Sequence, residues 1–370
     1  MENKKESRKL DVTFQDVEDD MQKLFREDPA KVYGECNFPN SPQSNNDSSV
    51  LAMKDKILST IETSSVIVIR GPTGCGKTTQ IPQFILDANI KKRLDCNVIV
   101  TQPRRIAAIS IAKRVCHERG WRLGTLVGYK VDMQQEVSPE TRLTYCTTEI
   151  LLQHLIRQKH LLDYTHIILD EIHERDQNLD FLLLVIKRLL QTNSKQVKII
   201  LMSATIDVTK FARYFSTKVE NTLRPAPVIE ISEKRNFQIR TYYLDEINDM
   251  GNIPKVSVVK PKVTQRMREI CSFIINSLDE IDVNDNEEDS MPPQRHAVLI
   301  FLPGIYEIEE LYNYLSVFRE KLWDLTILHS LISDADKQHC VFRKPPQGYR
   351  RIILSTNIAE SSITMPDVKY

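Results

Sequence analysis

The residues with the clearest chemical potential form the segment Gly71–Thr78, which has the pattern G-x-x-x-x-G-K-T. An apolar run, Val66–Ile69, precedes it and the helix-compatible residues 79–88 follow it. Glycines let such a loop turn tightly, so that backbone N–H groups point at phosphate oxygens, and the next helix adds the positive end of its dipole. The sequence therefore predicts a phosphate-binding loop, in which Lys77 reaches the β- and γ-phosphates and the Thr78 hydroxyl binds Mg²⁺. The expected nucleotide contacts are Gly71, Pro72, Thr73, Gly74, Cys75, Gly76, Lys77, Thr78 and Thr79.

A second segment, Ile167–Arg175, places two adjacent carboxylates after an apolar run. Asp170 is positioned to hold Mg²⁺ through its water shell, and Glu171 to orient and deprotonate the water that attacks the γ-phosphate. With Thr78, both acids form the expected Mg²⁺ site, partly through water. Acids also favour helix N-termini, so capping of the next helix is the alternative interpretation. The upstream phosphate loop favours catalysis, because phosphoryl transfer needs mainly a lysine, a metal and a base.

Further polar residues follow other apolar runs. Ser203-Ala-Thr205 is either a helix N-cap or a link toward His173 that couples the nucleotide to a second domain. Arg104 and Arg105 suit bidentate contacts to the phosphates of a nucleic acid, although a solvated basic helix start is the alternative. Thr147 and Thr148 are expected to add hydroxyl contacts to the same backbone.

Short apolar runs alternate with helical segments from residue 51 onward, which predicts an α/β fold with a parallel sheet covered on both faces. Ligands in such folds bind at the carboxyl ends of the strands, where all these residues fall. The expected strands are Val66–Arg70, Asn97–Gln102, Arg142–Thr147, His166–Glu171 and Lys198–Ser203, and the expected helices between them are Arg104–Glu118, Glu149–Lys159 and Asp180–Leu190.

The alternation of apolar runs and helical segments stops near Pro225-Ala-Pro227, which sets the expected domain boundary. Residues 1–50 are expected to be a polar, partly disordered leader, residues 51–225 a first domain, and residues 226–370 a second, incomplete domain. Within the second domain we expect strands at 228–232 and 238–245, a helix near 264–278 and a solvated acidic loop at 279–294. Strands at 297–303, 324–330 and 350–357 and helices to about 319 and at 334–342 follow.

Composition limits the partners. Fifty Lys and Arg balance fifty Asp and Glu, so local clusters rather than a global basic field must attract a nucleic acid. The charged N-terminus has no apolar core typical of a secretory signal, and no run of eighteen apolar residues predicts a membrane span.

Taken in order, these segments resemble the DEAH-box group of superfamily 2 helicases. The matching segments are Gly71–Thr78, Thr101–Arg105, Val127–Tyr129, Thr147–Leu151, Asp170–His173, Ser203–Thr205, Leu299–Gly304 and Ser355–Thr364. The resemblance covers roughly residues 51–370. It implies two RecA-like domains in tandem, ATP and Mg²⁺ as cofactors, a role for His173 beside the acids, and RNA as the partner of Arg104, Arg105, Thr147, Thr148, Ser355 and Thr356. It also implies that Arg114 stacks on the adenine and that Phe342 lies on the other face of that base.

A narrower similarity is to the Tudor-domain helicases of the spindle-E type, carried by Glu118–Trp121, Asp180–Val185, Thr192–Ser194 and Phe301–Ile308. That likeness implies a role in piRNA-mediated silencing of transposons, piRNA-pathway proteins as partners, and a cytoplasmic location in germ granules. RNA rather than DNA is implied by the family and not decided by these residues.

Two departures from the family matter. Ile172 stands where Ala or Val is usual, and the Gln-Arg-x-Gly-Arg-x-Gly-Arg motif with the arginine fingers is not among the 370 residues. Such fingers raise turnover about 10³–10⁵-fold, so this polypeptide is expected to bind ATP but hydrolyse it poorly. Two other functions stay open: a nucleotide-gated RNA-binding scaffold without productive unwinding, and a small-molecule kinase, which the second-domain segments disfavour.

Overall fold

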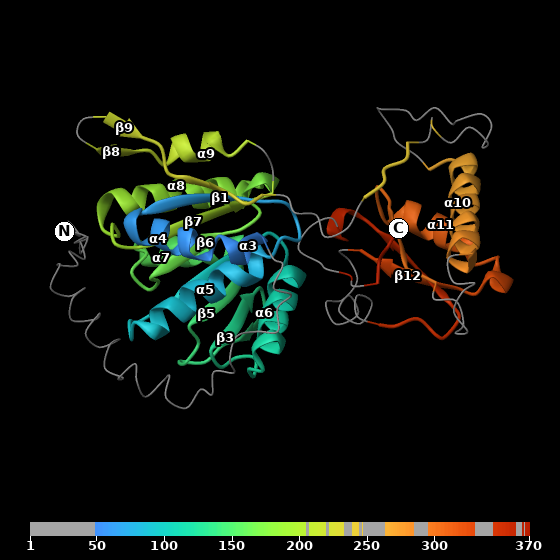
Figure 1. Cartoon of the computed structure of the whole chain (residues 1–370), viewed down its shortest axis with the longest axis horizontal. Coiled ribbons are helices and arrows are strands. Elements are labelled where there is room, and N and C mark those ends of the chain that lie inside the picture. Colours follow the sequence, from blue (N-terminus) through green and yellow to red (C-terminus); the bar gives the residue numbers. More distant parts are fainter. Residues whose placement is uncertain are drawn as a thin grey trace, which may run out of the picture.

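Two mainly parallel sheets organise the described part of the chain (Figure 1). The structure is a computed structural model that describes residues 49–204, 207–219, 222–232, 239–243, 246, 263–284, 295–329, 343–359, 365 and 367–370. Residues 1–48 of the expected leader and the expected helix at 334–342 lie outside these residues, whereas Ser49 and Val50, also expected in the leader, begin helix α3, Ser49–Ala52. No helix in the described ranges is long and apolar enough to cross a membrane.

The first sheet has eight strands in the order β10-β1-β7-β6-β2-β5-β3-β4. All neighbours pair in parallel except β3 and β4, which form an antiparallel hairpin at one edge. The strands are β1 Val66–Arg70, β2 Val98–Gln102, β3 Val127–Val131, β4 Gln134–Glu136, β5 Leu143–Thr147, β6 His166–Leu169, β7 Lys198–Ser203 and β10 Val228–Glu230. The expected α/β class and the five expected strands of this sheet are confirmed.

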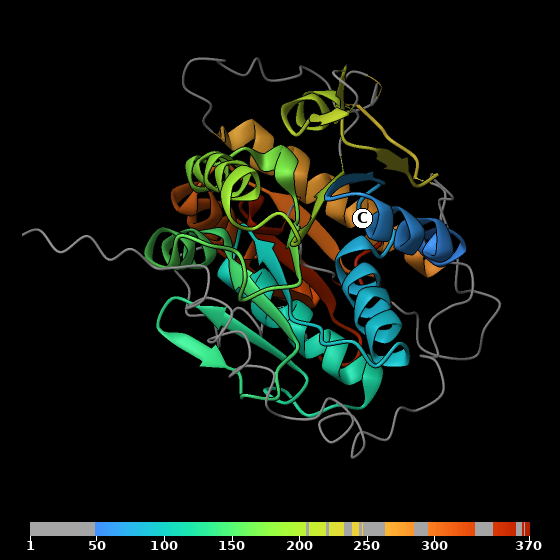
Figure 2. The same cartoon turned by 90° about the vertical axis from the view of Figure 1, so that its left-hand side faces the viewer.

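Helices cover both faces of this sheet, and Figure 2 shows its strands between the blue-to-cyan helices and the green ones. The helices are α3 Ser49–Ala52, α4 Lys54–Thr63, α5 Lys77–Lys91, α6 Arg105–Arg119, α7 Thr148–Gln158, α8 Gln177–Thr192 and α9 Thr209–Tyr214, with a 3₁₀ turn, η1, at Ile172–Glu174. A short hairpin, β8 Thr217–Val219 and β9 Thr222–Arg224, follows α9.

Alternation along the strands explains why two separate cores form. Side chains of successive strand residues point to opposite faces of a sheet. Ile67 and Ile69 of β1 therefore pack with α4, α5 and α6, while Val66 and Val68 pack with α7, α8 and α9. Burial on both faces is why the strands read as continuous apolar runs. This packing fixes the carboxyl ends of β1, β2, β6 and β7 at one edge, where the candidate site lies.

The second sheet is smaller, with the order β11-β13-β12. Its strands are β11 Val298–Phe301, β12 Trp323–Leu328 and β13 Arg350–Ser355, all parallel. Its helices are α10 Gln265–Asn284 and α11 Ile305–Leu315, with 3₁₀ turns η4 at Arg319–Lys321 and η5 at Asn357–Ala359. Ile275 of α10 and Leu311 of α11 pack on Ile352 and Leu354 of β13.

Two expectations about the region after Pro225 need correction. Strand β10 pairs with β1, so the first sheet continues past the expected boundary at residue 225. The stretch Asp279–Asn284, expected to begin a solvated loop, is the end of α10. The physical reason is a buried partner: Arg350 is fully buried and its Nη2 donates to Asp282 Oδ2 over 2.7 Å. The other residues of the expected acidic loop, 285–294, lie outside the described ranges.

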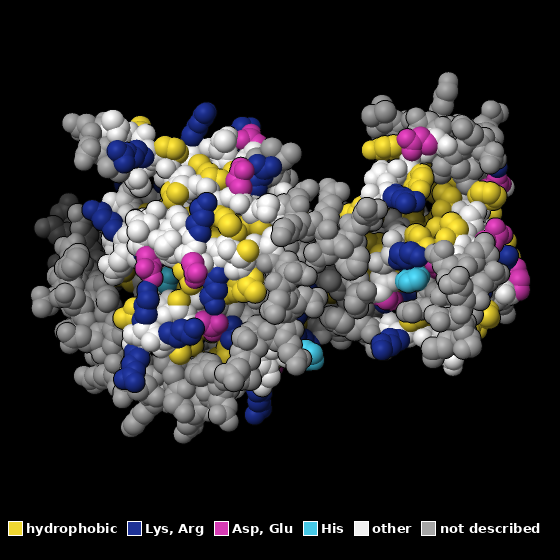
Figure 3. All heavy atoms as spheres, in the orientation of Figure 1, with side chains coloured by type: hydrophobic (Ala, Val, Ile, Leu, Met, Phe, Trp, Pro, Cys, Tyr) yellow, Lys and Arg dark blue, Asp and Glu magenta, His cyan; other side chains and the backbone are white. Residues whose placement is uncertain are grey.

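The hairpin β3–β4 is an element that the sequence did not predict, and the run 239–243, expected to be a strand, has no strand. Figure 3 shows Lys and Arg side chains scattered over one face of the larger lobe, with Asp and Glu among them. The described charged side chains of this face therefore carry both signs, as the balanced composition leads one to expect.

Candidate nucleotide-binding site

The loop between β1 and α5 has a backbone that only glycine adopts easily. Gly74 has φ +79° and Gly76, which precedes α5, has φ +95°. L-residues rarely adopt such left-handed conformations, which cost glycine nothing. A Cβ on Gly71 would come within 3.0 Å of Ile231 Cβ and 3.2 Å of Cys75 Sγ. The turn thus favours glycine at positions 74 and 76 through its positive φ angles, and at position 71 through the close contacts that a Cβ would make.

Lys77, the first residue of α5, turns its ammonium group back into this loop. Its Nζ donates to the carbonyls of Gly71 over 2.7 Å and of Pro72 over 2.9 Å, and only 5% of the residue is exposed. The positive N-terminal end of α5 faces the same space, while Thr73 and Gly74 form the exposed tip. A buried cation and a helix terminus that converge on one small loop make an anion-binding site.

Asp170 follows β6 and meets Thr78 of α5 across the loop. The Thr78 hydroxyl donates to Asp170 Oδ2 over 2.5 Å, and the Gln102 amide at the end of β2 donates to the same oxygen over 2.8 Å. The backbone N–H of Glu171 donates to Oδ1 over 2.9 Å. A hydroxyl and a carboxylate side by side next to a phosphate loop match the ligands that Mg²⁺ takes when it binds a nucleotide. The residues present therefore fit this metal.

Glu171 is held beside Asp170 in a left-handed backbone conformation, with φ +51°. Only 7% of the residue is exposed. Burial, and then the neighbouring Asp170 carboxylate, raise the pKa of Glu171 to about 7. Burial also raises the pKa of Asp170, against the opposing effect of the Thr78 and Gln102 hydrogen bonds. A carboxyl whose pKa lies near neutrality suits a general base, and a bound cation would favour the ionised form of both acids.

His173 connects the acids with the end of β7. Its Nδ1 lies 3.5 Å from Glu171 Oε2, and the backbone N–H of Ala204 donates to the same nitrogen over 3.5 Å. The carbonyl of Ser203 accepts the Gly71 N–H over 3.1 Å. The last residue of β7 and the residue after it thus contact the phosphate loop and the histidine, respectively, through their backbone. Thr205, the other residue of the predicted coupling pair, lies outside the described ranges.

The residues predicted to hold the adenine are seen only in part. Arg114 lies on α6, with half of its side chain exposed, and its Nε donates to Glu118 Oε1 over 3.0 Å. Gln80 and Gln83 of α5 donate to the other oxygen of the same carboxylate. The carboxylate thus ties Arg114 to the helix that begins at the phosphate loop. Phe342 lies outside the described ranges, and stacking of Arg114 stays a prediction.

The predicted RNA contacts lie at the carboxyl ends of strands but differ in accessibility. Arg104 pairs with Glu174 over 3.6 Å and Arg105 with Asp132 over 3.9 Å. The threonines and the serine are mostly buried: Thr147 and Thr356 are 8% exposed, Thr148 5% and Ser355 0%. Ser355 is the last residue of β13 in the second sheet, and Thr356 follows it. The two arginines present the more accessible groups for a phosphate backbone, and RNA binding by all six stays a prediction.

Sequence reasoning missed two residues that shape the site. Gln102 orients Asp170, and the buried Tyr145 hydroxyl donates to the Thr78 carbonyl over 3.0 Å. The position of Gln102 at the end of β2, inside a segment already singled out for its arginines, was the available signal. Tyr145 gave none, because it reads as an ordinary apolar residue of a buried strand.

Comparison with known proteins gives a consistent result. Residues 52–213 match the DEAD/DEAH box helicase family. The chain is 48% identical over 328 residues to a probable ATP-dependent RNA helicase spindle-E of Aedes aegypti, and 45% identical over 326 residues to the ATP-dependent RNA helicase TDRD9 of Danio rerio. Each match covers 86% of this chain and 24% of the relative, so the chain spans about a quarter of the length of these curated relatives.

The crystal structure of the Escherichia coli DEAH/RHA helicase HrpB is similar in fold, with a TM-score of 0.66 and 26% identity. The likeness covers 86% of this chain and 36% of the bacterial one. Together with the parallel eight-stranded sheet, this match is consistent with the RecA-like domains that the motifs implied.

Proposed function

The chain contains a DEAD/DEAH box helicase domain, and on that premise we propose that it is the nucleotide-driven motor of an ATP-dependent RNA helicase that hydrolyses ATP to ADP and phosphate. The observation that carries the proposal is the hydrogen bond from the Thr78 hydroxyl to Asp170 Oδ2, over 2.5 Å. It places these two groups beside Glu171 and beside the phosphate loop that holds the Lys77 ammonium group. A lysine, a metal-binding pair and a base in one place are the parts that phosphoryl transfer to water requires.

The described residues divide the chemistry among them. The loop N–H groups and the N-terminus of α5 bind the phosphates, and Lys77 exchanges its bonds to the Gly71 and Pro72 carbonyls for phosphate oxygens. Thr78 and Asp170 would hold Mg²⁺, which supplies charge neutralisation at the β- and γ-phosphates when bound. Glu171 orients the attacking water and accepts its proton. His173 and the backbone of Ser203 and Ala204 couple nucleotide binding in the loop to the rest of the chain, because Ser203 contacts the loop and Ala204 contacts His173.

The direct test compares the wild type with Glu171→Gln, using phosphate release with and without single-stranded RNA and the binding of a fluorescent, non-hydrolysable ATP analogue. Loss of a general base costs about 10²–10⁴ in rate, so turnover should fall by that factor while analogue binding is retained. Glu174→Gln is the matched control, because Glu174 is an acid three residues away that pairs with Arg104. Equal turnover in the wild type and Glu171→Gln would refute the assigned base.

The division into domains is also part of the proposal. We place a RecA-like first domain at residues 51–230, which include β10, and a second domain in the residues that follow, with ATP between them and RNA across the carboxyl ends of their strands. The 370 residues contain no arginine-finger motif, so this polypeptide should bind ATP and turn it over poorly, whereas a longer chain that supplies the motif should be stimulated by RNA. A longer chain without RNA stimulation would favour the scaffold alternative, in which ATP acts only as a clamp.

The biological setting that we propose is piRNA-mediated silencing of transposons in the germline, with piRNA-pathway proteins as partners and cytoplasmic perinuclear germ granules as the location. The support is the similarity to spindle-E and TDRD9 helicases. Replacement of the endogenous protein by a Glu171→Gln variant in germ cells should raise transposon transcripts as much as its removal does. Normal transposon silencing in cells that lack the protein would exclude this setting.

A further inference from the structure

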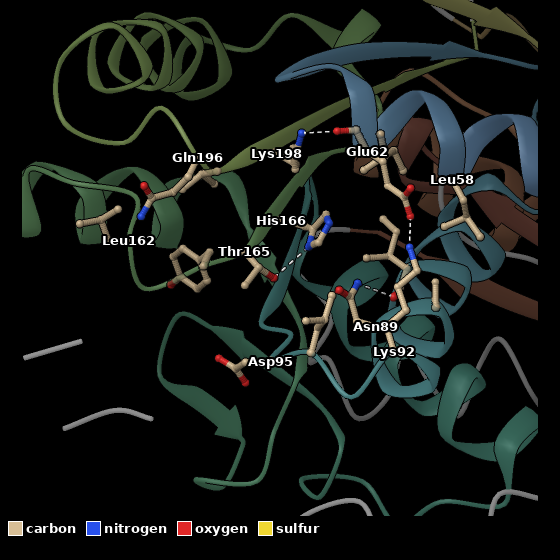
Figure 4. Close-up of a pocket in the computed structure, with 16 residues that line it drawn as sticks. Leu58, Glu62, Asn89, Lys92, Asp95, Leu162, Thr165, His166, Gln196 and Lys198 are labelled. Atoms are coloured by element: carbon tan, nitrogen blue, oxygen red, sulfur yellow. Dashed lines mark hydrogen bonds and ion pairs between the residues drawn. The ribbon is translucent and has the colours of Figure 1, made fainter. Parts of the chain in front are cut away.

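A groove of about 530 Å³ opens at the edge of the first sheet opposite the nucleotide site (Figure 4). It lies between the C-terminal halves of α4 and α5 and the starts of β6 and β7. In the view of Figure 4, Leu162 and Gln196 lie on one side of the groove, and Leu58, Asn89 and Lys92 lie on the other. We call it the amino-edge groove, because the strands β6 and β7 begin there.

The lining of the amino-edge groove combines apolar and polar side chains. Ile61 of α4, Ile85 of α5 and Val197 line it and are at most 4% exposed, whereas Leu94, which also lines it, is 51% exposed. The uncharged polar lining residues are Asn89, Tyr164, Thr165, His166 and Gln196. A mixed lining of this kind suits the apolar stripe of an amphipathic helix, whose flanks are polar, better than a wholly apolar ligand.

The charges at this edge favour an acidic partner. The two carboxylates of the lining are already neutralised, because Glu62 pairs with Lys92 and Asp95 lies 4.0 Å from Arg142. Further cations line the groove or stand next to lining residues in the chain: Lys91, Arg93, Lys195 and Lys198. Positive charge is therefore in excess around an apolar surface.

A segment of the same chain, upstream of α3, has the complementary pattern. Residues 14–28, which lie outside the described ranges, contain five apolar residues at the spacing of one helix face: Phe14, Val17, Met21, Leu24 and Phe25. Thr13 and Asp16 have the spacing of a capping box, and Pro29 is a stop signal directly after the segment. The sequence thus predicts an amphipathic helix about 22 Å long.

The remaining residues of this segment, which we call the acidic segment, are mostly charged. Residues 14–28 contain six carboxylates and two cations. Since the five apolar residues occupy one face, the carboxylates fall on the flanks and on the opposite face. Anionic lipid head groups repel such a helix, whereas the cations at the amino-edge groove attract it.

The connection to α3 lets the acidic segment reach the groove. Residues 29–48 separate it from Ser49, and these twenty residues span up to about 66 Å when extended. The groove begins at Leu58 on α4, the helix that follows α3. A short tether gives an effective concentration on the order of millimolar, which favours the segment of the same chain over a second copy.

We propose that residues 14–28 dock as an amphipathic helix in the amino-edge groove of their own chain. The apolar stripe covers Leu58, Leu94 and Leu162, and the acidic flanks lie beside the cations of this edge. The contact ties the N-terminal segment to the ends of α4 and α5, at the edge of the sheet away from Lys77 and Asp170. It is an interaction surface separate from the nucleotide site.

Hydrogen exchange of the complete 370-residue chain tests the docking. Val17→Ser with Met21→Ser removes two side chains from the apolar stripe, and Asp19→Ser with Lys23→Ser is the matched control on the polar face; neither pair changes the net charge. Burial of two apolar side chains is worth more than a factor of ten. The amides of residues 14–28 should therefore exchange at least about tenfold faster in the first variant than in the wild type, and within about threefold of the wild type in the control.

Two substitutions of exposed leucines locate the docking site. Leu94→Asp puts a carboxylate into the lining and should speed exchange of the acidic segment at least about tenfold. Leu184→Asp alters a residue on α8 that is 56% exposed and outside the lining, and it should leave the exchange unchanged. Reversal of two cations, Lys91→Glu with Arg93→Glu, should speed exchange about 3–10-fold at low salt and less at high salt.

A photoreactive side chain shows which surface the acidic segment touches. Met21→p-benzoylphenylalanine in the complete chain should cross-link within one molecule to the ends of α4 and α5 or to Leu162, as mapped by mass spectrometry. Any of four results would overturn the proposal: equal exchange in the two serine double variants, equal exchange in Leu94→Asp and Leu184→Asp, no effect of the charge reversal, or cross-links to a second copy or to residues away from the groove.

Discussion

The hydrogen bond from Gln102 to Asp170 leads to a prediction that separates an effect on Mg²⁺ binding from an effect on stability. The Gln102 amide nitrogen donates to Asp170 Oδ2 over 2.8 Å, while its own oxygen is buried without a hydrogen-bond partner among the described residues. Gln102→Met keeps the shape and removes both groups. The variant loses a hydrogen bond to a charged acceptor, worth about 1.5–3 kcal/mol, but it also removes an orphaned acceptor whose burial costs about 1–3 kcal/mol.

The two effects act on different observables. The free energy of unfolding should change by less than about 1 kcal/mol, because the lost bond and the removed orphan offset each other. The Mg²⁺ concentration needed for half-maximal binding of an ATP analogue should rise about 10–100-fold, because Asp170 loses a donor that orients it and favours its ionised form.

Mg²⁺ titrations monitored with a fluorescent ATP analogue, together with urea unfolding, measure both quantities. Thr101→Val is the matched control, since Thr101 is equally buried on β2 and donates only to the Ile168 carbonyl over 3.5 Å. A Gln102→Met protein that is destabilised by several kcal/mol, with an unchanged Mg²⁺ midpoint, would show that Gln102 is structural and that the reasoning is wrong.

Three predictions concern the frame around the sites. Gly128→Ala should destabilise the chain by about 3 kcal/mol or more in urea unfolding, because a Cβ there would lie 2.1 Å from the Glu136 carbonyl oxygen of the paired strand. Gly120→Ala should cost clearly less, because no atom lies within 4 Å of its Cβ and only the positive φ of +65° opposes the change. Arg350→Met should lower the free energy of unfolding by about 3–5 kcal/mol, since it leaves the buried Asp282 carboxylate without its main cation. The additional substitution Asp282→Leu should recover part of this loss, and no recovery would show that the unpaired carboxylate is not its cause. The pKa of His166 is lowered from 6.5 to about 4 in the folded state, so its contribution to stability is complete above pH 6.5 and is lost as the pH falls toward 4. The loss is about 1.4 kcal/mol per pH unit and about 3 kcal/mol in all. The difference in unfolding free energy between the wild type and His166→Leu should show this slope, and a pH-independent difference would contradict the buried neutral ring.

Several features followed from the sequence alone because they depend on local patterns. The phosphate loop needs glycines, a lysine and a threonine at fixed spacing between a strand and a helix, and each is within eight residues of the others. Strands that are buried on both faces have continuous apolar sequences, and such runs predicted β1, β2, β5, β6 and β7. The same runs placed Asp170 and Glu171 at the carboxyl edge of the sheet, where ligands bind.

Only the tertiary structure decided which side chains meet. Thr78 and Asp170 are 92 residues apart in the chain, Gln102 and Asp170 are 68 apart, and Tyr145 and Thr78 are 67 apart. The length of α10 likewise depended on Arg350, 68 residues beyond Asp282. The hydrogen bond between the Thr165 hydroxyl and the Asn97 carbonyl also joins residues 68 positions apart. Local periodicity specifies what kind of element a segment forms, but hydrogen bonds and ion pairs between distant segments exist only once the sheet has fixed its strand order and register.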